Sequence, residues 1–263
     1  MRVNHISELT DDLVPIVDAF LHSDPFINAY AIWDLHYLRH KTKFFVYLDN
    51  GTLAGLLMDY LSDAGIHFIW LWGEVDAVKK LLNIPLPDKM IFFIFPEYEN
   101  IVRQKFPITA KYQVIFMLLQ RGQENLQIRH EVRRLDLKDA YSLVSLRKEK
   151  PSEEEIKGAE RKLKEQACYG IFIDSTLVST ACIQVRLPEI WIIGDFYTKP
   201  EYRNKGYATS LASFLVKEAL KETNHVGLFV RSDNYPAKRV YEKVGFQAYR
   251  EMYWLDCGTG LIP

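Results

Sequence analysis

Three pairs of segments recur in the same order along this 263-residue chain, and this internal repeat limits the possible folds more than any other feature. The first pair is typical of strand, Asp-led turn and strand; the second of strand, turn and amphipathic helix; the third of a final strand. The pairs are residues 44–58 with 169–183, 91–106 with 227–246, and 110–119 with 248–256. Matches this weak also arise by chance between α/β segments, but their preserved order favours duplication.

The spacing of the repeat locates a difference between its copies. Asp49 aligns with Asp174 at an offset of 125 residues, and Phe93 aligns with Phe229 at an offset of 136, so the second copy holds 11 additional residues between these points. We therefore predict a first domain at 1–122, a second domain at 128–263 that carries the chemistry, and a polar linker within 121–130 (RGQENLQIRH).

The interval that holds these additional residues contains the stretch DFYTKPEYRNKGYATS at 195–210. The strand predicted at 190–198 ends within this stretch, and after Gly206 apolar residues recur at helical spacing. The first N–H groups of a helix lack internal partners and carry partial positive charge. Arg203 and Lys205 add charge there, while Gly206 permits close approach to the backbone. The turn thus resembles a phosphate cradle, although a solvated basic turn is the alternative; it matches neither the P-loop nor the dinucleotide pattern.

A second motif follows at 228–246, LFVRSDNYPAKRVYEKVGF. Asn234 is a favourable N-cap, Pro236 fits a first helical turn, and Gly245 is suited to end the helix. The spacing of Ala237, Val240, Tyr241 and Val244 predicts that this short helix turns its tyrosine inward.

The two motifs, FYTKPEYRNKGYA and NYPAKRVYEKVGF, resemble those of the GNAT superfamily of acyl-CoA-dependent N-acyltransferases, and most closely its glycine N-acyltransferase-like branch. The resemblance covers about residues 128–256. The first half resembles the same fold without the motif. The expected fold is therefore α/β with a mixed sheet (α+β): two tandem GNAT-like domains, of which the C-terminal one is complete and the first is degenerate.

The resemblance implies acetyl-CoA, or another acyl-CoA, as co-substrate and no metal. The diphosphate would lie on the backbone after Arg203, the pantetheine arm would pair with backbone groups before it, and Asn234 would touch the cofactor or serve only as a helix cap. The implied cofactor-binding residues are Phe196, Tyr197, Thr198, Arg203, Asn204, Lys205, Gly206, Tyr207, Ala208, Thr209 and Asn234.

The resemblance also implies catalytic roles. Tyr241 stands at the position that protonates the leaving thiolate, with a buried core tyrosine as the alternative. Asp195 is the predicted general base, with a solvated carboxylate at a strand end as the alternative. Glu189 or a chain of water molecules could serve instead. The expected activity is transfer of an acetyl group to a primary amine of a small molecule or amino acid. The other reading is a sensor that binds acyl-CoA without catalysis.

Composition narrows the classes of partner that the protein is expected to bind. A net charge of −1 gives no basic field for nucleic acid, and no apolar run approaches the ~20 residues of a membrane helix. The cysteines, Cys168, Cys182 and Cys257, form no evident disulfide set, so a reduced cytoplasmic protein is expected. The histidines show no metal-binding spacing, and His130 is assigned to the surface or a domain boundary. The charged segment 147–166 is predicted to form a solvated helix beside the acceptor site.

Overall fold

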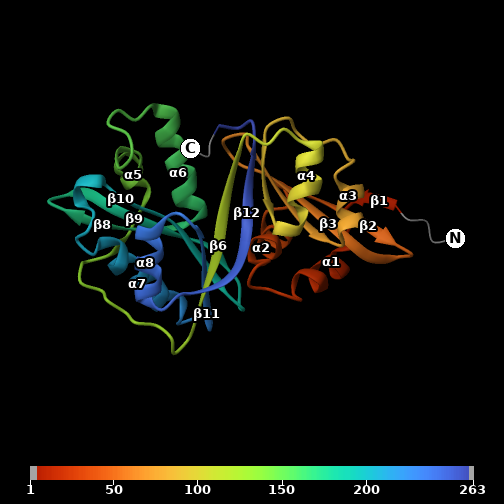
Figure 1. Cartoon of the computed structure of the whole chain (residues 1–263). Helices are drawn as coiled ribbons and strands as arrows, with labels where there is room; N and C mark the ends of the chain where they lie inside the picture. Colours follow the sequence, from red (N-terminus) through yellow and green to blue (C-terminus); the bar gives the residue numbers. More distant parts are fainter. Residues whose placement is uncertain (1–4, 261–263) are drawn as a thin grey trace. The chain divides into compact units, whose positions relative to one another are not determined.

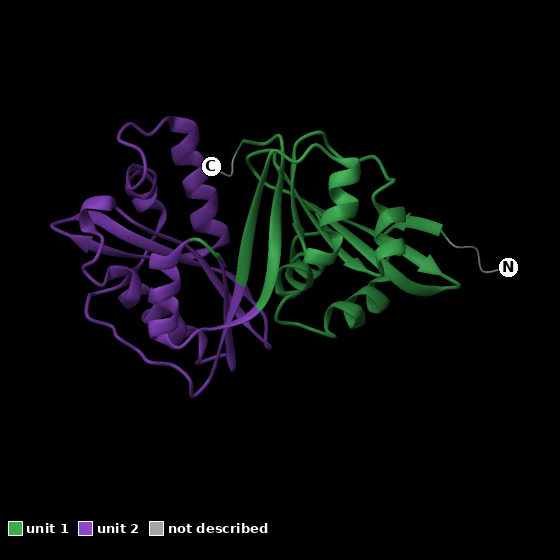
Figure 2. Ribbon diagram, viewed as in Figure 1, with its two compact units in different colours: residues 1–115, 231–233, 250–263 green, residues 116–230, 234–249 purple. Residues whose placement is uncertain are grey.

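The computed structural model describes residues 5–260 (Figure 1). The chain forms two compact units, and Figure 2 colours them separately. The first unit contains the chain up to Ile115, Arg231–Asp233 and the segment that begins at Arg250. The second contains Phe116–Val230 and Asn234–Tyr249. Each unit has mixed α/β architecture, as the sequence predicted.

In the first unit the strand order is β1-β2-β3-β4-β5-β12, and only the β4–β5 pair among those assigned is parallel. Helix α3 packs on strands β2, β3 and β4. The elements are β1 (His5–Glu8), α1 (Val14–Leu21), α2 (Ala29–Tyr37), β2 (Thr42–Asp49), β3 (Thr52–Leu61), β4 (His67–Gly73), α3 (Val75–Leu81), β5 (Met90–Ile94), the 3₁₀ helix η1 (Pro96–Tyr98) and α4 (Glu99–Lys105).

In the second unit the order is β6-β11-β10-β9-β8-β7, with β10 and β11 parallel. The order of helices and strands along the chain is the same as in the first unit. The elements are β7 (Arg133–Arg134), η2 (Leu137–Asp139), α5 (Ala140–Ser145), α6 (Glu153–Glu165), β8 (Ala167–Ile173), β9 (Thr176–Arg186), β10 (Trp191–Thr198), η3 (Pro200–Tyr202), α7 (Tyr207–Ala219), β11 (His225–Arg231) and α8 (Tyr235–Val244). Two further strands, β6 (Ala110–Gln120) and β12 (Gln247–Cys257), each have residues in both units, because the chain changes unit after Ile115 and after Tyr249.

Helices cover both faces of the second unit's sheet. Cys168 packs in the core formed with α5 and α6, whereas the ring of the next residue, Tyr169, lies 5.3 Å from the ring of Phe214 on α7. Because successive residues of a strand point to opposite faces, α5 and α6 cover one face and α7 the other. Helix α6 is therefore more than the solvated helix that its charge predicted, since Ala159 and Leu163 are buried in this core.

The predicted domain boundary differs from the structure at the C-terminus. Residues after Arg250, expected in the second domain, belong to the first unit because β12 pairs with β5. In that register Tyr253 lies opposite Ile94 and Trp254 opposite Phe93. The weak resemblance between the two final strands could not reveal which sheet each of them joins.

The expectation that the cysteines form no disulfide is also corrected. The structure joins Cys168 to Cys182, which lie directly opposite one another in the β8–β9 register with a Cα–Cα distance of 4.0 Å. A separation of 14 residues spans this hairpin and so brings the two side chains together. Cys257 is a free, buried thiol. Over residues 5–260, no helix combines the length and the apolar character needed to cross a membrane.

Candidate active site

The candidate site begins where β10 departs from regular pairing. Gly194 lies opposite Cys182 and Tyr197 opposite Thr180, so β10 carries one additional residue between these pairs. Such a β-bulge re-aims the backbone and its side chains. Asp195 lies in the bulge with a φ of +53°, a left-handed conformation uncommon outside glycine.

The other edge of β10 opens at the same level. Over the residues that the structure describes, the assigned pairing of β10 with β11 is limited to Trp191–Val226 and Ile192–Gly227. Beyond Ile192, backbone groups on this edge of β10 are available to an extended ligand, which could pair with them as an added strand does.

The predicted phosphate cradle follows the strand. Asn204 and Gly206 both have positive φ, +61° and +84°, and Gly206 is the N-cap of α7. The N–H of Ser210 makes the first helical hydrogen bond, to the carbonyl of Gly206 at 3.0 Å. The preceding N–H groups of the first turn are therefore without helical partners. Arg203, Lys205 and Gly206 are exposed. This is an open helix start with two cations, as an anion site requires.

Helix α8 brings Tyr241 to the bulge. Oδ1 of Asn234 accepts the N–H of Ala237 at 3.3 Å and caps the helix, and Gly245, with a φ of +116°, ends it. Tyr241 is only 6% exposed, and its ring lies 5.3 Å from that of Phe196 in an edge-on arrangement. Burial raises the pKa of Tyr241 above its usual value, so the hydroxyl keeps its proton at neutral pH. Among residues 5–260 this hydroxyl has no hydrogen-bond partner.

Asp195 is held by two cations from the face that α5 and α6 cover: Arg147, which follows α5, and Lys162 on α6. Its Oδ1 lies 2.7 Å from Nη2 of Arg147, and its Oδ2 bonds to Nζ of Lys162. Burial by itself would raise the pKa of Asp195, but Lys162 and Arg147 outweigh it and hold the pKa below the usual value. A carboxylate with a lowered pKa and both oxygens occupied is a weak proton acceptor. The geometry thus weighs against Asp195 as the base, an assignment that remains a prediction.

The residues after the bulge alternate between the two faces. Phe196 faces Tyr241, whereas Tyr197 packs in the α5–α6 core with the Arg147 guanidinium 4.8 Å from its ring centroid. Oγ of Ser179 donates to the Tyr197 carbonyl at 3.2 Å, and Nε of Arg203 donates to the Thr198 carbonyl at 3.2 Å. These bonds fix the end of β10 against the cradle.

Not every predicted residue enters the site through its side chain. Glu189 precedes the start of β10, at the end away from the cradle, and its carbonyl lies 3.2 Å from Nδ1 of His225. Tyr207 and Thr209 are buried side chains on α7, so only their backbone N–H groups can serve a ligand. Asn204, Ala208 and Asn234 lie at the helix starts as predicted.

Comparison with known proteins decides the family. Over 124 residues the chain is 31% identical to streptothricin acetyltransferase from Escherichia coli, a match that covers 47% of this chain and 71% of that protein. A profile of the acetyltransferase (GNAT) family matches residues 131–246, the region that contains the bulge, the cradle and Tyr241. The chain belongs to the GNAT acetyltransferase family.

Solved structures extend the likeness to the whole GNAT chain. A Drosophila protein superposes with a TM-score of 0.73 at 12% identity, covering 97% of this chain and 98% of its own. A tandem GNAT protein from the clavulanic acid biosynthesis pathway superposes with a TM-score of 0.68 at 14% identity, covering 98% and 100%. At such identities the likeness shows the fold alone: tandem GNAT-like units, of which the C-terminal one carries the family motifs.

The segment 121–130, predicted to be a linker, lies along α7 in this GNAT protein. The N–H groups of Gln127 and Arg129 donate to the hydroxyls of Ser213 and Ser210 at 2.9 and 3.1 Å. Nδ1 of His130 lies 2.9 Å from Oγ of Ser210. The linker interpretation is thus wrong for these residues. Two serines on the buried side of α7 were the available signal that another segment must satisfy them.

In the part of the first unit that the structure describes, no loop like the cradle follows the corresponding strand. Between β4 and α3 it has only Glu74, whereas eight residues, 199–206, separate β10 from α7. Gly73, at the end of β4, has a φ of +117°, and its carbonyl accepts the hydroxyl of the buried Tyr98. The β4–α3 connection is thus too short to form a loop like residues 199–206.

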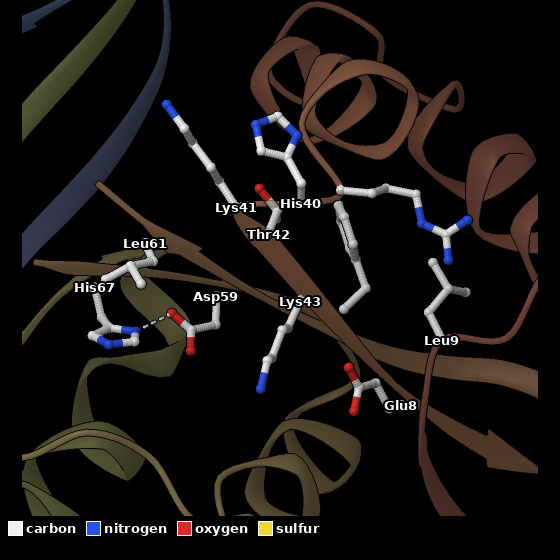
Figure 3. A pocket seen from close by; sticks show the side chains of 11 residues that line it. Glu8, Leu9, His40, Lys41, Thr42, Lys43, Asp59, Leu61 and His67 are labelled. Atoms are coloured by element: carbon white, nitrogen blue, oxygen red, sulfur yellow. Dashed lines mark hydrogen bonds and ion pairs between the residues drawn. The ribbon is translucent and has the colours of Figure 1, made fainter. Parts of the chain in front are cut away.

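The first unit instead contains a cavity of about 350 Å³ at the start of β2, drawn in Figure 3. Oδ1 of Asp59 lies 2.7 Å from Nδ1 of His67 on its wall, and Lys43 is opposite Asp59 in the β2–β3 register. Thr42, which also lines it, donates to Oδ2 of the buried Asp34 at 3.2 Å. Burial raises the pKa of Asp34 to about 7. No residue of this cavity was among those that the sequence indicated.

Proposed function

We propose that this GNAT protein transfers an acetyl group from acetyl-CoA to a primary amine of a small molecule or an amino acid. One observation carries the proposal: a single unit combines an open, glycine-capped helix start with a protonated, unpartnered tyrosine hydroxyl beside a strand bulge. The first feature suits binding of a diphosphate, and the second suits protonation of a leaving group.

The residues present fit the co-substrate. The N–H groups of Tyr207, Ala208 and Thr209 would hold the diphosphate, with Arg203 and Lys205 adding charge at the rim. Phe196, Tyr197 and Thr198 would offer the free edge of β10 to the pantetheine arm. Asn204 and Asn234 flank this path at the helix starts. Bound acetyl-CoA supplies an activated acyl group as a thioester.

Tyr241 is the proposed acid. Its hydroxyl gives a proton to the departing sulfur as the C–S bond breaks and the bond to the amine nitrogen forms. The backbone N–H groups at the bulge are candidates to stabilise the developing oxyanion. The attacking amine must be neutral and then lose a proton, for which a water molecule suits this geometry better than Asp195, whose oxygens are occupied.

Asp195 would then organise the site. It joins the bulge to Arg147, just after α5, and to Lys162 on α6. Helices α5 and α6 cover the face of the sheet opposite Tyr241. The charged segment 147–166 contributes to an acceptor site in this proposal. Streptothricin, which gives the relative from Escherichia coli its name, is a reasonable amine to test as acceptor.

The first unit is proposed to be a degenerate copy that binds no CoA. Its order of helices and strands matches that of the second unit, but its closed β4–α3 turn leaves no cradle. We retain the glycine N-acyltransferase-like branch as the predicted subgroup and the cytoplasm as the predicted location. The Cys168–Cys182 disulfide is the observation that weighs against a reducing compartment.

The test is release of free thiol from acetyl-CoA with the full chain and a panel of amines that includes amino acids and streptothricin. Amine-dependent thiol release with N-acetylated product supports the enzyme. Calorimetric titration with CoA should give one site per chain, and a second site would refute the assignment of the first unit. Tight CoA binding without turnover on any acceptor would favour the sensor, and absence of binding at millimolar CoA would exclude both functions.

A further inference from the structure

We propose that His130, from the segment that precedes the family motifs, is an additional contact for the diphosphate of acetyl-CoA. The inference rests on the proposed acetyl-CoA site in the second unit. It adds a side chain that neither the sequence motif nor the spacing of the repeat indicated.

His130 is held firmly on α7. Its Nδ1 lies 2.9 Å from Oγ of Ser210, a residue with no exposed surface, and its ring centroid is 4.4 Å from that of Tyr207. The neighbouring N–H of Arg129 donates to the same hydroxyl. A ring fixed on two sides has already lost the rotamer freedom that ligand binding would otherwise remove.

The free edge of this ring borders the cradle. A Cβ placed on Gly206 would have Cε1 of His130 at 3.7 Å, and no other heavy atom from elsewhere in the described chain lies within 4 Å of it. Cε1 joins the two ring nitrogens, and Nδ1 is the one bonded to Ser210. Within residues 5–260 the ring makes no hydrogen bond through Nε2. A ligand seated over Gly206 would therefore meet the Cε1–Nε2 edge.

The hydrogen bonds of Ser210 allow Nε2 of His130 to act as a donor. The serine hydroxyl accepts from Arg129, and its own proton can go to Nδ1 of His130 or to the carbonyl of Gln127 at 3.4 Å. When Nδ1 accepts a hydrogen bond from the Ser210 hydroxyl, the neutral ring carries its own hydrogen on Nε2. A diphosphate oxygen beside Nε2 would accept this hydrogen.

The decisive experiment compares two acetyl donors in wild-type protein and His130→Phe. Phenylalanine keeps a ring against Tyr207 and removes both nitrogens. With acetyl-CoA, we expect KM and the Kd for CoA to rise about tenfold, as loss of a hydrogen bond to a charged group predicts, with kcat within twofold. With S-acetylpantetheine, which has no diphosphate, kcat/KM should be the same for both proteins.

A second variant distinguishes loss of the hydrogen bond from loss of packing. His130→Gln retains an N–H donor, and we expect its Kd for CoA to lie between those of wild type and His130→Phe at an unchanged melting temperature. Equal affinity of wild type and His130→Phe for CoA overturns this inference alone. An equal loss with both acetyl donors also overturns it, because the ring then acts only through the fold. Wild-type protein that fails to bind CoA overturns the proposed function together with this inference.

Discussion

Oδ1 of Asp195, in the bulge of β10, lies 2.7 Å from Nη2 of Arg147, which follows α5. The other carboxylate oxygen bonds to Lys162 on α6. One side chain therefore joins the bulge to both helices that cover that face of the second unit. Its left-handed backbone, with a φ of +53°, is maintained where these two ion pairs meet.

We predict that Asp195→Asn destabilises the second unit by about 1–3 kcal/mol at pH 7, the typical loss for hydrogen bonds to charged groups. Because the folded-state pKa of Asp195 is lowered, its stabilisation is present above the unfolded pKa of about 3.9 and is lost as pH falls through the folded value. We therefore expect the difference in free energy of unfolding between the variant and wild type to shrink below about pH 3.9. Denaturant unfolding at several pH values measures this difference.

The Asp195→Asn variant also distinguishes a structural role of Asp195 from a role as general base. As an anchor, Asp195 should affect kcat by less than tenfold, and the variant should keep the shape of the pH–rate profile. A drop of ~10²–10⁴ with loss of the acidic limb of the profile would restore Asp195 as the general base.

Tyr241→Phe should lower kcat by about 10², the lower end of the range for a positioned acid, because a thiolate is already a fair leaving group. The ring would still pack against Phe196, so the melting temperature and the Kd for CoA should change little. Rapid mixing with single-turnover conditions measures the chemical step directly. An unaltered rate would assign the proton to water, whereas lost stability with an intact rate would leave only a packing role.

The sequence predicted those parts of the molecule that depend on local pattern. Gly206 and Asn234 cap the helices at which spacing and residue type placed them, and Tyr241 points inward from α8. These features are set by residues within about one helical turn of each other, so a single sequence contains the information.

What the sequence missed depends on pairing across long separations. The partners of Asp195 lie 48 and 33 residues away, and His130 meets Ser210 across 80 residues. The assignment of β12 to the first unit depends on its register with β5. Such contacts leave no local periodicity. The charge of 147–166 therefore predicted a solvated helix, and the polar composition of 121–130 predicted a linker.

The buried Asp34 of the first unit should make stability fall as pH rises. Its pKa is raised to about 7 by burial, partly offset by the hydrogen bond from Thr42. The folded state thus favours the protonated acid, and this contribution is fully present below about pH 4 and declines as pH rises toward 7. The free energy of unfolding of Asp34→Asn should equal that of wild type at pH 4. At pH 8 it should be higher by a few kcal/mol, on the order of 1.4 kcal/mol per pKa unit. Thermal unfolding at both pH values tests this, and a variant less stable than wild type at pH 8 would contradict it.

The last prediction compares Gly206→Asn with Gly206→Asp. Asparagine and aspartate have nearly the same shape, both tolerate positive φ better than other residues, and the space over Gly206 has room for a Cβ. The carboxylate should interact favourably with the α7 dipole, so the Asp variant should be at least as thermally stable as the Asn variant. For CoA the order should reverse, because the same charge would repel the diphosphate. We expect the Kd of the Asp variant to be at least tenfold weaker than that of the Asn variant at low salt, with the gap narrowing as salt screens it. Opposite effects on stability and affinity cannot come from misfolding. Equal CoA affinity of the two variants would place the diphosphate away from α7.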